Sequence, residues 1–149
     1  MSTIAIVYRS PHHGNTKKLL DAIVRAHPDV TLIQAGEDDF SPKRYDVIGF
    51  ASGVYAGRLH RTVRKAIASA DGNGRKAFVL YTCGDTLGGK YCERFIGDLN
   101  KQGYETLGCY WCTGWDSFGP LKLVGGVHKD KPDGNDIAGA VTFFEGLNA

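Results

Sequence analysis

The turn formed by residues 10–16 carries the residue types from which proteins build phosphate-binding sites. A short apolar run at residues 4–8, rich in β-branched side chains, predicts a buried strand before this turn, and a helical pattern follows it. The first N–H groups of a helix have no partner within the helix, and the helix dipole adds positive potential there. Ser10, Asn15 and Thr16 add hydrogen-bonding side chains at the same position. The turn is therefore predicted to bind a phosphate group.

Apolar runs and helical patterns alternate along the chain. Strands are expected at residues 4–8, 30–33, 46–51, 76–82 and 105–111, and helices after residue 16, after residue 57, around residues 91–99 and from residue 134. Asp133 is the expected N-cap of the last helix. The alternation predicts one domain, residues 1–149, with a five-stranded parallel sheet in a three-layer α/β/α sandwich. Ligands of such sheets bind beyond the carboxyl ends of the strands, so the turns after the first, third and fourth strands would face one crevice.

The composition is that of a soluble globular protein with a substantial core. The 149 residues are 42% hydrophobic and 23% charged, and a net charge of +2 lacks the strong basic bias of nucleic-acid-binding proteins. No apolar run approaches the length of a membrane span, and the first residues lack the pattern of a signal peptide. We therefore expect a cytoplasmic protein whose four cysteines are thiols.

Three segments, taken in order, resemble the flavin-binding loops of the flavodoxin family. In the first, Ser10 and the sequence Gly14-Asn15-Thr16 match the family's phosphate loop, although the turn is one residue longer and His13 stands where a threonine is usual. The second, residues 46–60 (DVIGFASGVYAGRLH), is similar to the loop of small flavodoxin-like proteins that lays a tyrosine ring against the isoalloxazine. The third, residues 82–85, resembles the loop whose backbone N–H groups meet the pyrimidine edge of the flavin.

This resemblance implies the strand order 2-1-3-4-5, non-covalently bound FMN and a function in electron transfer. From the residues themselves, no side chain is expected to act as an acid–base catalyst and no metal site is expected. Tyr55 would pack against the flavin ring. The residues that the resemblance assigns to the cofactor are Ser10, His12, His13, Gly14, Asn15, Thr16, Ser52, Gly53, Val54, Tyr55, Ala56, Gly57, Thr82, Cys83, Gly84 and Asp85. A later stretch, residues 114–136, is similar to a subgroup with a Gly-Gly-x-x-Lys segment before the last helix.

A cluster of basic residues suggests an alternative function. Arg58, Arg61, Arg64 and Lys65 lie at the start of the second expected helix, either as a solvated face or as a rim that attracts an anionic partner. Flavodoxins that carry electrons are typically acidic, whereas this chain is slightly basic. The alternative is an FMN-dependent NAD(P)H or quinone reductase, or a protoporphyrinogen dehydrogenase-like oxidoreductase, which the Tyr-Ala-Gly-Arg segment resembles. The expected partner is a redox protein or a small anionic electron donor or acceptor.

Specific residues disfavour three other classes with a related layout. A receiver domain needs acidic residues after the first strand, where this chain has Arg9-Ser10-Pro11. A low-molecular-weight phosphatase needs a cysteine in its phosphate loop, and no cysteine precedes Cys83. A dinucleotide-binding Rossmann domain needs Gly-x-Gly-x-x-Gly after the first strand, where only Gly14 is present. A partner-binding domain that has lost its flavin stays an alternative.

The remaining reactive residues receive ordinary structural interpretations. Cys109 and Cys112 form a Cys-x-x-Cys segment on a predicted strand, where residues three apart point to opposite faces, so a redox pair is disfavoured. Cys83 is expected to contribute its backbone N–H rather than its thiol. Trp111 is expected in the core, and the pair His12-His13 is expected to contact phosphate or solvent rather than a metal.

Overall fold

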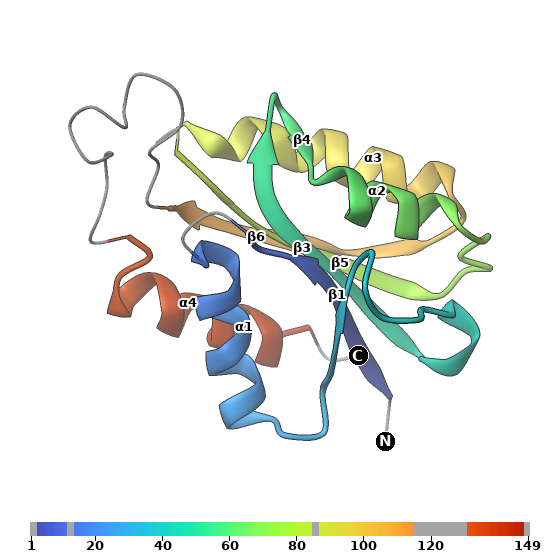
Figure 1. The fold of residues 1–149 in the computed structure, drawn as a ribbon, viewed down its shortest axis with the longest axis horizontal. Coiled ribbons are helices and arrows are strands. Elements are labelled where there is room, and N and C mark those ends of the chain that lie inside the picture. The colour runs from blue at the N-terminus through green and yellow to red at the C-terminus, as the bar shows by residue number, and fades with distance from the viewer. Residues whose placement is uncertain (1–2, 12–13, 85–86, 115–130, 148–149) are drawn as a thin grey trace.

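The computed structural model describes residues 3–11, 14–84, 87–114 and 131–147 (Figure 1). Its centre is a twisted parallel sheet in the order β2-β1-β3-β5-β6. The strands are β1 (Ile4–Arg9), β2 (Thr31–Gln34), β3 (Val47–Tyr55), β5 (Lys76–Cys83) and β6 (Glu105–Thr113). A two-residue strand, β4 (Arg58–Leu59), pairs antiparallel with the end of β3. With β4 set aside, the order is the predicted 2-1-3-4-5.

Helices cover both faces of the sheet, as the sequence predicts (Figure 1). One face carries α1 (Asn15–Ala26) and α4 (Gly134–Glu145), and the other carries α2 (Arg61–Ala68) and α3 (Cys92–Lys101). Two short 3₁₀ helices, η1 (Pro42–Arg44) and η2 (Gly88–Tyr91), lie in the connections. Among the described residues, no helix has the length and apolar character needed to cross a membrane.

Each face of the sheet has its own hydrophobic core, because successive strand residues point to opposite sides. On the side of α2 and α3, Phe50 and Val79 pack with Val63 and Leu99, all fully buried. On the side of α1 and α4, the corresponding buried residues are Ile6, Phe78, Leu80, Leu19, Leu20, Ile23, Ala140 and Phe144. The two clusters share no residue, so the sheet separates two cores.

The third strand is longer than the sequence predicts. Residues 52–57 are expected as a glycine-bearing turn, but β3 continues through Ser52 to Tyr55 and the turn is confined to Ala56 and Gly57. Both turn residues have positive φ, 52° and 78° respectively, as a tight two-residue hairpin requires. The hairpin places Arg58 opposite Tyr55, and α2 begins only at Arg61.

The predicted N-cap of the last helix is confirmed. The Asp133 carboxylate accepts a hydrogen bond from the Asp136 N–H at 2.9 Å, and the Asp136 carboxylate accepts one from the Asp133 N–H at 3.0 Å. This capping box satisfies N–H groups that the helix leaves unpaired. The hydrogen bond from the Asp136 backbone lowers the pKa of Asp133, and Lys131, 2.9 Å away, lowers it further.

The expectation that all four cysteines are thiols is wrong for two of them. A disulfide joins Cys92, at the start of α3, to Cys109 in β6, with their Cα atoms 6.2 Å apart. Cys83 and Cys112 are not disulfide-bonded, and both are buried. Cys109 and Cys112 therefore do not form a Cys-x-x-Cys pair, and burial raises the pKa of the Cys112 thiol to about 12.

Candidate functional site

The ends of three neighbouring strands meet at one edge of the sheet. Arg9, the last residue of β1, is in register with Ser52, and Gly53 is in register with Thr82 near the end of β5. The hydroxyls of Thr16 and Thr82 lie 3.0 Å apart and are buried, which joins the first turn of α1 to β5. The three predicted loops thus lie together at the carboxyl edge, the usual ligand position of such sheets.

The first loop leads into the N-terminus of α1. The residue before α1, Gly14, has a left-handed conformation with φ of +65°, and no described atom lies within 4 Å of the position where its Cβ would be. The Ser10 hydroxyl accepts a hydrogen bond from the Lys17 N–H at 3.1 Å, which ties the loop to the first turn. Asn15 and Thr16 are buried at the start of the helix. The helix dipole makes this N-terminus a favourable position for an anion.

A fourth segment, which the sequence analysis did not assign to the site, packs against the first loop. Gly114 follows β6, and its N–H donates to the carbonyl oxygen of Cys83 at 2.9 Å. A Cβ on Gly114 would lie 2.5 Å from the side-chain nitrogen of Asn15, closer than side chains approach. Only glycine lets this backbone approach Asn15, so Gly114 is a further residue of the site.

The second loop is held by a buried serine. The Ser52 hydroxyl donates to the Gly53 carbonyl oxygen at 2.7 Å and accepts from the His60 N–H at 2.9 Å. Ser52 thereby fixes both ends of the hairpin that carries Tyr55. Ser52 is fully buried, and its described hydrogen bonds lie within the hairpin. Its role is therefore to position the hairpin.

Tyr55 is the exposed aromatic residue of the second loop. Its side chain keeps 37% of its surface accessible and lies against Gly53, where a Cβ would be 3.3 Å from the Tyr55 hydroxyl. The ring also meets the His60 ring edge-on, with centroids 5.3 Å apart. Partial burial raises the pKa of Tyr55, an effect that the Arg9 cation opposes. Tyr55 can therefore offer a neutral aromatic face to a ligand.

The third loop presents backbone rather than a reactive thiol. Thr82 and Cys83 are buried, and the Cys83 sulfur occupies the space where Gly88 would otherwise carry a Cβ. The Tyr81 hydroxyl donates to the Gly88 carbonyl oxygen at 2.7 Å, which fixes η2 over this sulfur. His12, His13 and Asp85 of the predicted site lie outside the described residues, as do residues 115–130.

Comparison with known proteins identifies this architecture. No family model matches the sequence. The chain is 33% identical over 144 residues to Uncharacterized protein MJ0298 of Methanocaldococcus jannaschii, covering 95% of both chains, and the two proteins belong to one family. Oxidised Flavodoxin 1 from Bacillus cereus superposes with a TM-score of 0.70 at 16% identity, over 97% of this chain and 95% of that chain. The chain has the flavodoxin fold.

Two further solved structures share the flavodoxin fold. A flavodoxin from the domain Archaea matches with a TM-score of 0.68 at 15% identity, covering 98% of this chain and 99% of that chain. The general stress protein 14 of Treponema denticola, solved in complex with FMN, matches with a TM-score of 0.64 at 11% identity, covering 99% of both chains. At sequence identities this low, the structural similarity establishes the fold alone.

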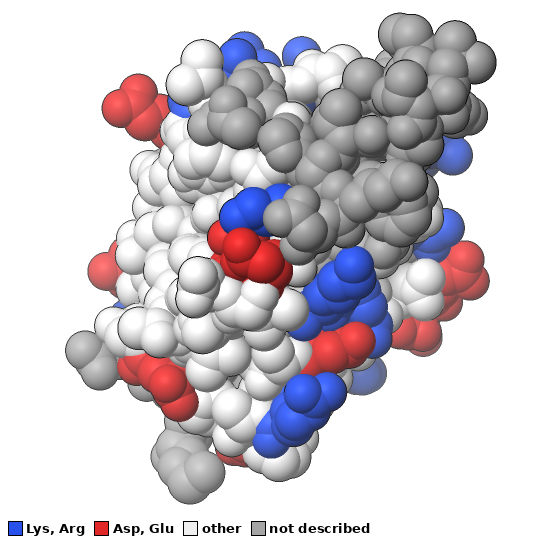
Figure 2. Space-filling view, turned by 90° about the vertical axis from the view of Figure 1, so that its left-hand side faces the viewer, with Lys and Arg blue, Asp and Glu red and all other residues white. Residues whose placement is uncertain are grey.

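Charges on this flavodoxin-fold chain are mixed. Figure 2 shows the side at which β6 ends and α4 begins, where Lys and Arg side chains alternate with Asp and Glu over the described surface. The basic cluster predicted at the start of the second helix is divided. Arg58 and Arg64 line a cavity of about 370 Å³ between α2 and α3, and Arg61 and Lys65 are exposed outside it. The sequence analysis missed Arg94, which reaches the same cavity from α3.

Proposed function

We propose that the protein binds FMN non-covalently and transfers electrons through it. The observation that carries this proposal is the buried contact between Thr16 and Thr82, because it draws the α1 N-terminus and the end of β5 to one site. The Treponema denticola protein has the same fold and was solved in complex with FMN, which supports the choice of cofactor.

The residues at this edge fit the parts of FMN. The N–H groups at the start of α1, with the side chains of Ser10 and Asn15, would hold the phosphate, while the buried Thr16 hydroxyl fixes the helix against β5. The exposed ring of Tyr55 would pack against the isoalloxazine, and the backbone at Cys83 and Gly84 would meet its polar edge. FMN supplies the redox chemistry when bound, while the protein supplies binding, orientation and exclusion of water.

A comparison of FMN with riboflavin tests this proposal, because the two flavins differ only in the phosphate. We expect FMN to bind at least about 100-fold more tightly than riboflavin, since charge-assisted hydrogen bonds to the phosphate are lost with riboflavin. Quenching of flavin fluorescence during titration measures both affinities. Asn15→Ala should reduce this ratio, whereas Thr142→Ala, an exposed residue of α4, should leave it unchanged. Equal affinities for FMN and riboflavin would contradict the phosphate site.

A second function is favoured by the three arginines near the β3–β4 hairpin. Arg58, Arg64 and Arg94 create positive potential beside Tyr55, which suits an anionic electron donor or acceptor such as a nicotinamide dinucleotide. In this alternative, the protein is an FMN-dependent reductase rather than a carrier for a redox partner protein. Oxidation of NADH or NADPH by the FMN-loaded protein, measured at 340 nm with a quinone or dye as acceptor, distinguishes the two functions.

A further inference from the structure

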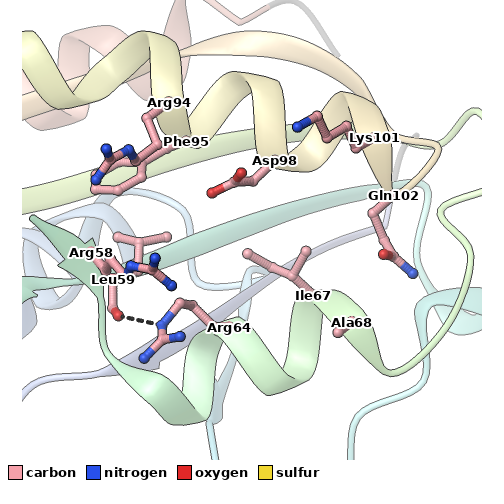
Figure 3. Close-up of a pocket in the computed structure, with 10 residues that line it drawn as sticks. All are labelled: Arg58, Leu59, Arg64, Ile67, Ala68, Arg94, Phe95, Asp98, Lys101 and Gln102. Atoms are coloured by element: carbon pink, nitrogen blue, oxygen red, sulfur yellow. Dashed lines mark hydrogen bonds between the residues drawn. The ribbon is translucent and has the colours of Figure 1, made fainter.

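A groove lies between α2 and α3, and β4, at the end of the second loop, closes one end of it (Figure 3). Its volume is about 370 Å³, which is within the usual range for small-molecule sites. Leu59, Ile67 and Phe95 form an apolar floor, and each is nearly inaccessible to solvent. The groove therefore has the size and the apolar base of a binding site.

Three guanidinium groups gather at the β4 end of this groove. Arg64 donates through Nε to the Leu59 carbonyl oxygen at 3.1 Å, and Arg94 donates through Nη1 to the Gly57 carbonyl oxygen at 3.3 Å. Both arginines thus hold the backbone on either side of Arg58. Within the described part of the chain, none of the three forms an ion pair with a carboxylate. Their charges remain available to an anion, and guanidinium forks match phosphate oxygens.

One carboxylate limits what this groove accepts. Asp98 lies one turn after Arg94 on α3 and extends into the groove, and Lys101 follows it toward the far end (Figure 3). Asp98 would repel a ligand with negative charge along its whole length. A ligand with one anionic group for the arginines and neighbouring hydroxyls for Asp98 would complement the groove. Carboxylates accept hydrogen bonds from sugar hydroxyls in known nucleotide sites. The set of side chains therefore suits a phosphorylated sugar.

We propose that this groove binds a small phosphate ester of a sugar, with the phosphate on Arg58, Arg64 and Arg94 and the sugar hydroxyls on Asp98. The site is distinct from the phosphate loop at the start of α1 and does not depend on FMN. It abuts the hairpin that carries Tyr55, because Arg58 is paired with Tyr55 across the β3–β4 turn.

Titration with ribose 5-phosphate tests the groove. The protein is first saturated with FMN to fill the phosphate loop, and binding is followed by calorimetry and by amide chemical shifts. Arg58→Gln should weaken binding about tenfold, because one charge-assisted contact to phosphate is removed. The Arg58 side chain makes no hydrogen bond or ion pair with the other described residues, and glutamine keeps the backbone pairing with Tyr55, so the variant should fold. The matched control Arg61→Gln, exposed on α2 outside the groove, should bind as the wild type does.

The Asp98→Asn variant distinguishes the contribution of the sugar to binding from that of the phosphate. It should tighten the binding of inorganic phosphate several-fold by removing a like charge, while abolishing the preference for ribose 5-phosphate over inorganic phosphate. Absence of binding, equal affinities of the Arg58→Gln and Arg61→Gln variants, or tighter binding of citrate than of ribose 5-phosphate would each overturn the proposal. The same titrations on flavin-free protein keep this result independent of whether FMN binds.

Discussion

The hydroxyl of Thr16 lies 3.0 Å from that of Thr82, in a buried contact between residues 66 positions apart in the chain. One residue belongs to the first turn of α1 and the other to the end of β5. The contact therefore sets the separation between the predicted phosphate loop and the third loop, and neither hydroxyl is exposed to water.

Thr16→Val should destabilise the protein by about 1–3 kcal/mol, because it leaves the Thr82 hydroxyl buried without this partner. The double variant Thr16→Val and Thr82→Val should cost less than the sum of the two single variants, since no hydroxyl is then left unpaired. Urea denaturation of the four proteins measures the coupling. Strict additivity would show that the two hydroxyls do not interact.

Tyr55→Ala should weaken FMN binding about tenfold, because packing of an aromatic ring and its buried area is lost. Tyr55→Phe keeps the ring and should bind FMN within about twofold of the wild type. Fluorescence titration gives both affinities, and thermal unfolding without FMN shows whether the fold is intact. An equal loss of affinity in the two variants would assign the effect to the hydroxyl rather than to the ring.

His60 should make the stability of α2 dependent on pH. Its Nδ1 accepts a hydrogen bond from the Thr62 N–H at 3.2 Å as the N-cap, which requires an unprotonated nitrogen. Burial, together with the cations of Arg9, Arg61 and Arg64, lowers the pKa of His60 from 6.5. The unfolded chain therefore binds this proton more readily, so the contribution is complete above pH 6.5 and is lost as the pH falls below that value.

His60→Asn keeps a good capping residue but removes the titration. Its free energy of unfolding, measured in urea from pH 7.5 to pH 5, should fall less steeply with decreasing pH than that of the wild type. Identical slopes for the two proteins would exclude His60 as the titrating group.

Gly57→Ala should destabilise the protein by about 1 kcal/mol, because its φ of +78° disfavours a side chain. A Cβ there would also lie 3.4 Å from the Arg94 guanidinium, which holds the Gly57 carbonyl. The control is Gly97→Ala in α3, where a Cβ meets no atom within 4 Å and should stabilise the helix by about 0.5–1 kcal/mol. Equal effects at the two glycines in thermal unfolding would contradict the hairpin geometry.

Reduction of the disulfide between Cys92 and Cys109 should lower the free energy of unfolding by about 3 kcal/mol, since a link across 17 positions restricts the unfolded chain. In the folded protein, Cys83 and Cys112 should resist alkylation by iodoacetamide because both are buried. Peptide mapping by mass spectrometry before and after reduction identifies the linked pair. A link involving Cys112 would contradict the arrangement described above.

Periodicity was sufficient to predict the sheet and the helices, because the buried residues recur at the spacing of their elements. Leu19, Leu20 and Ile23 form the inner face of α1, and the apolar run at residues 77–81 forms a central strand. The strand order came from the family resemblance. Asp133 was identifiable as an N-cap because capping depends on a local sequence signal.

Features that depend on distant contacts were missed. Ser52 and Gly53 suggest a turn by residue type, yet the hydrogen bonds of Ser52 to Gly53 and His60 allow β3 to continue. The partner of Cys109 follows from the packing of α3 on β6, which has no local signal. Arg94 lies far along the chain from Arg58 and Arg64, so only the fold brings the three together.

The division of the interior into two cores has a consequence for how this protein can change over evolutionary time. The start of α1 rests on one core, and the groove between α2 and α3 rests on the other. Substitutions within the two clusters should therefore add with little coupling, except where the sheet transmits a backbone shift. A lineage could therefore change the ligand proposed for the groove without altering the proposed FMN site, and the reverse change would be equally accessible.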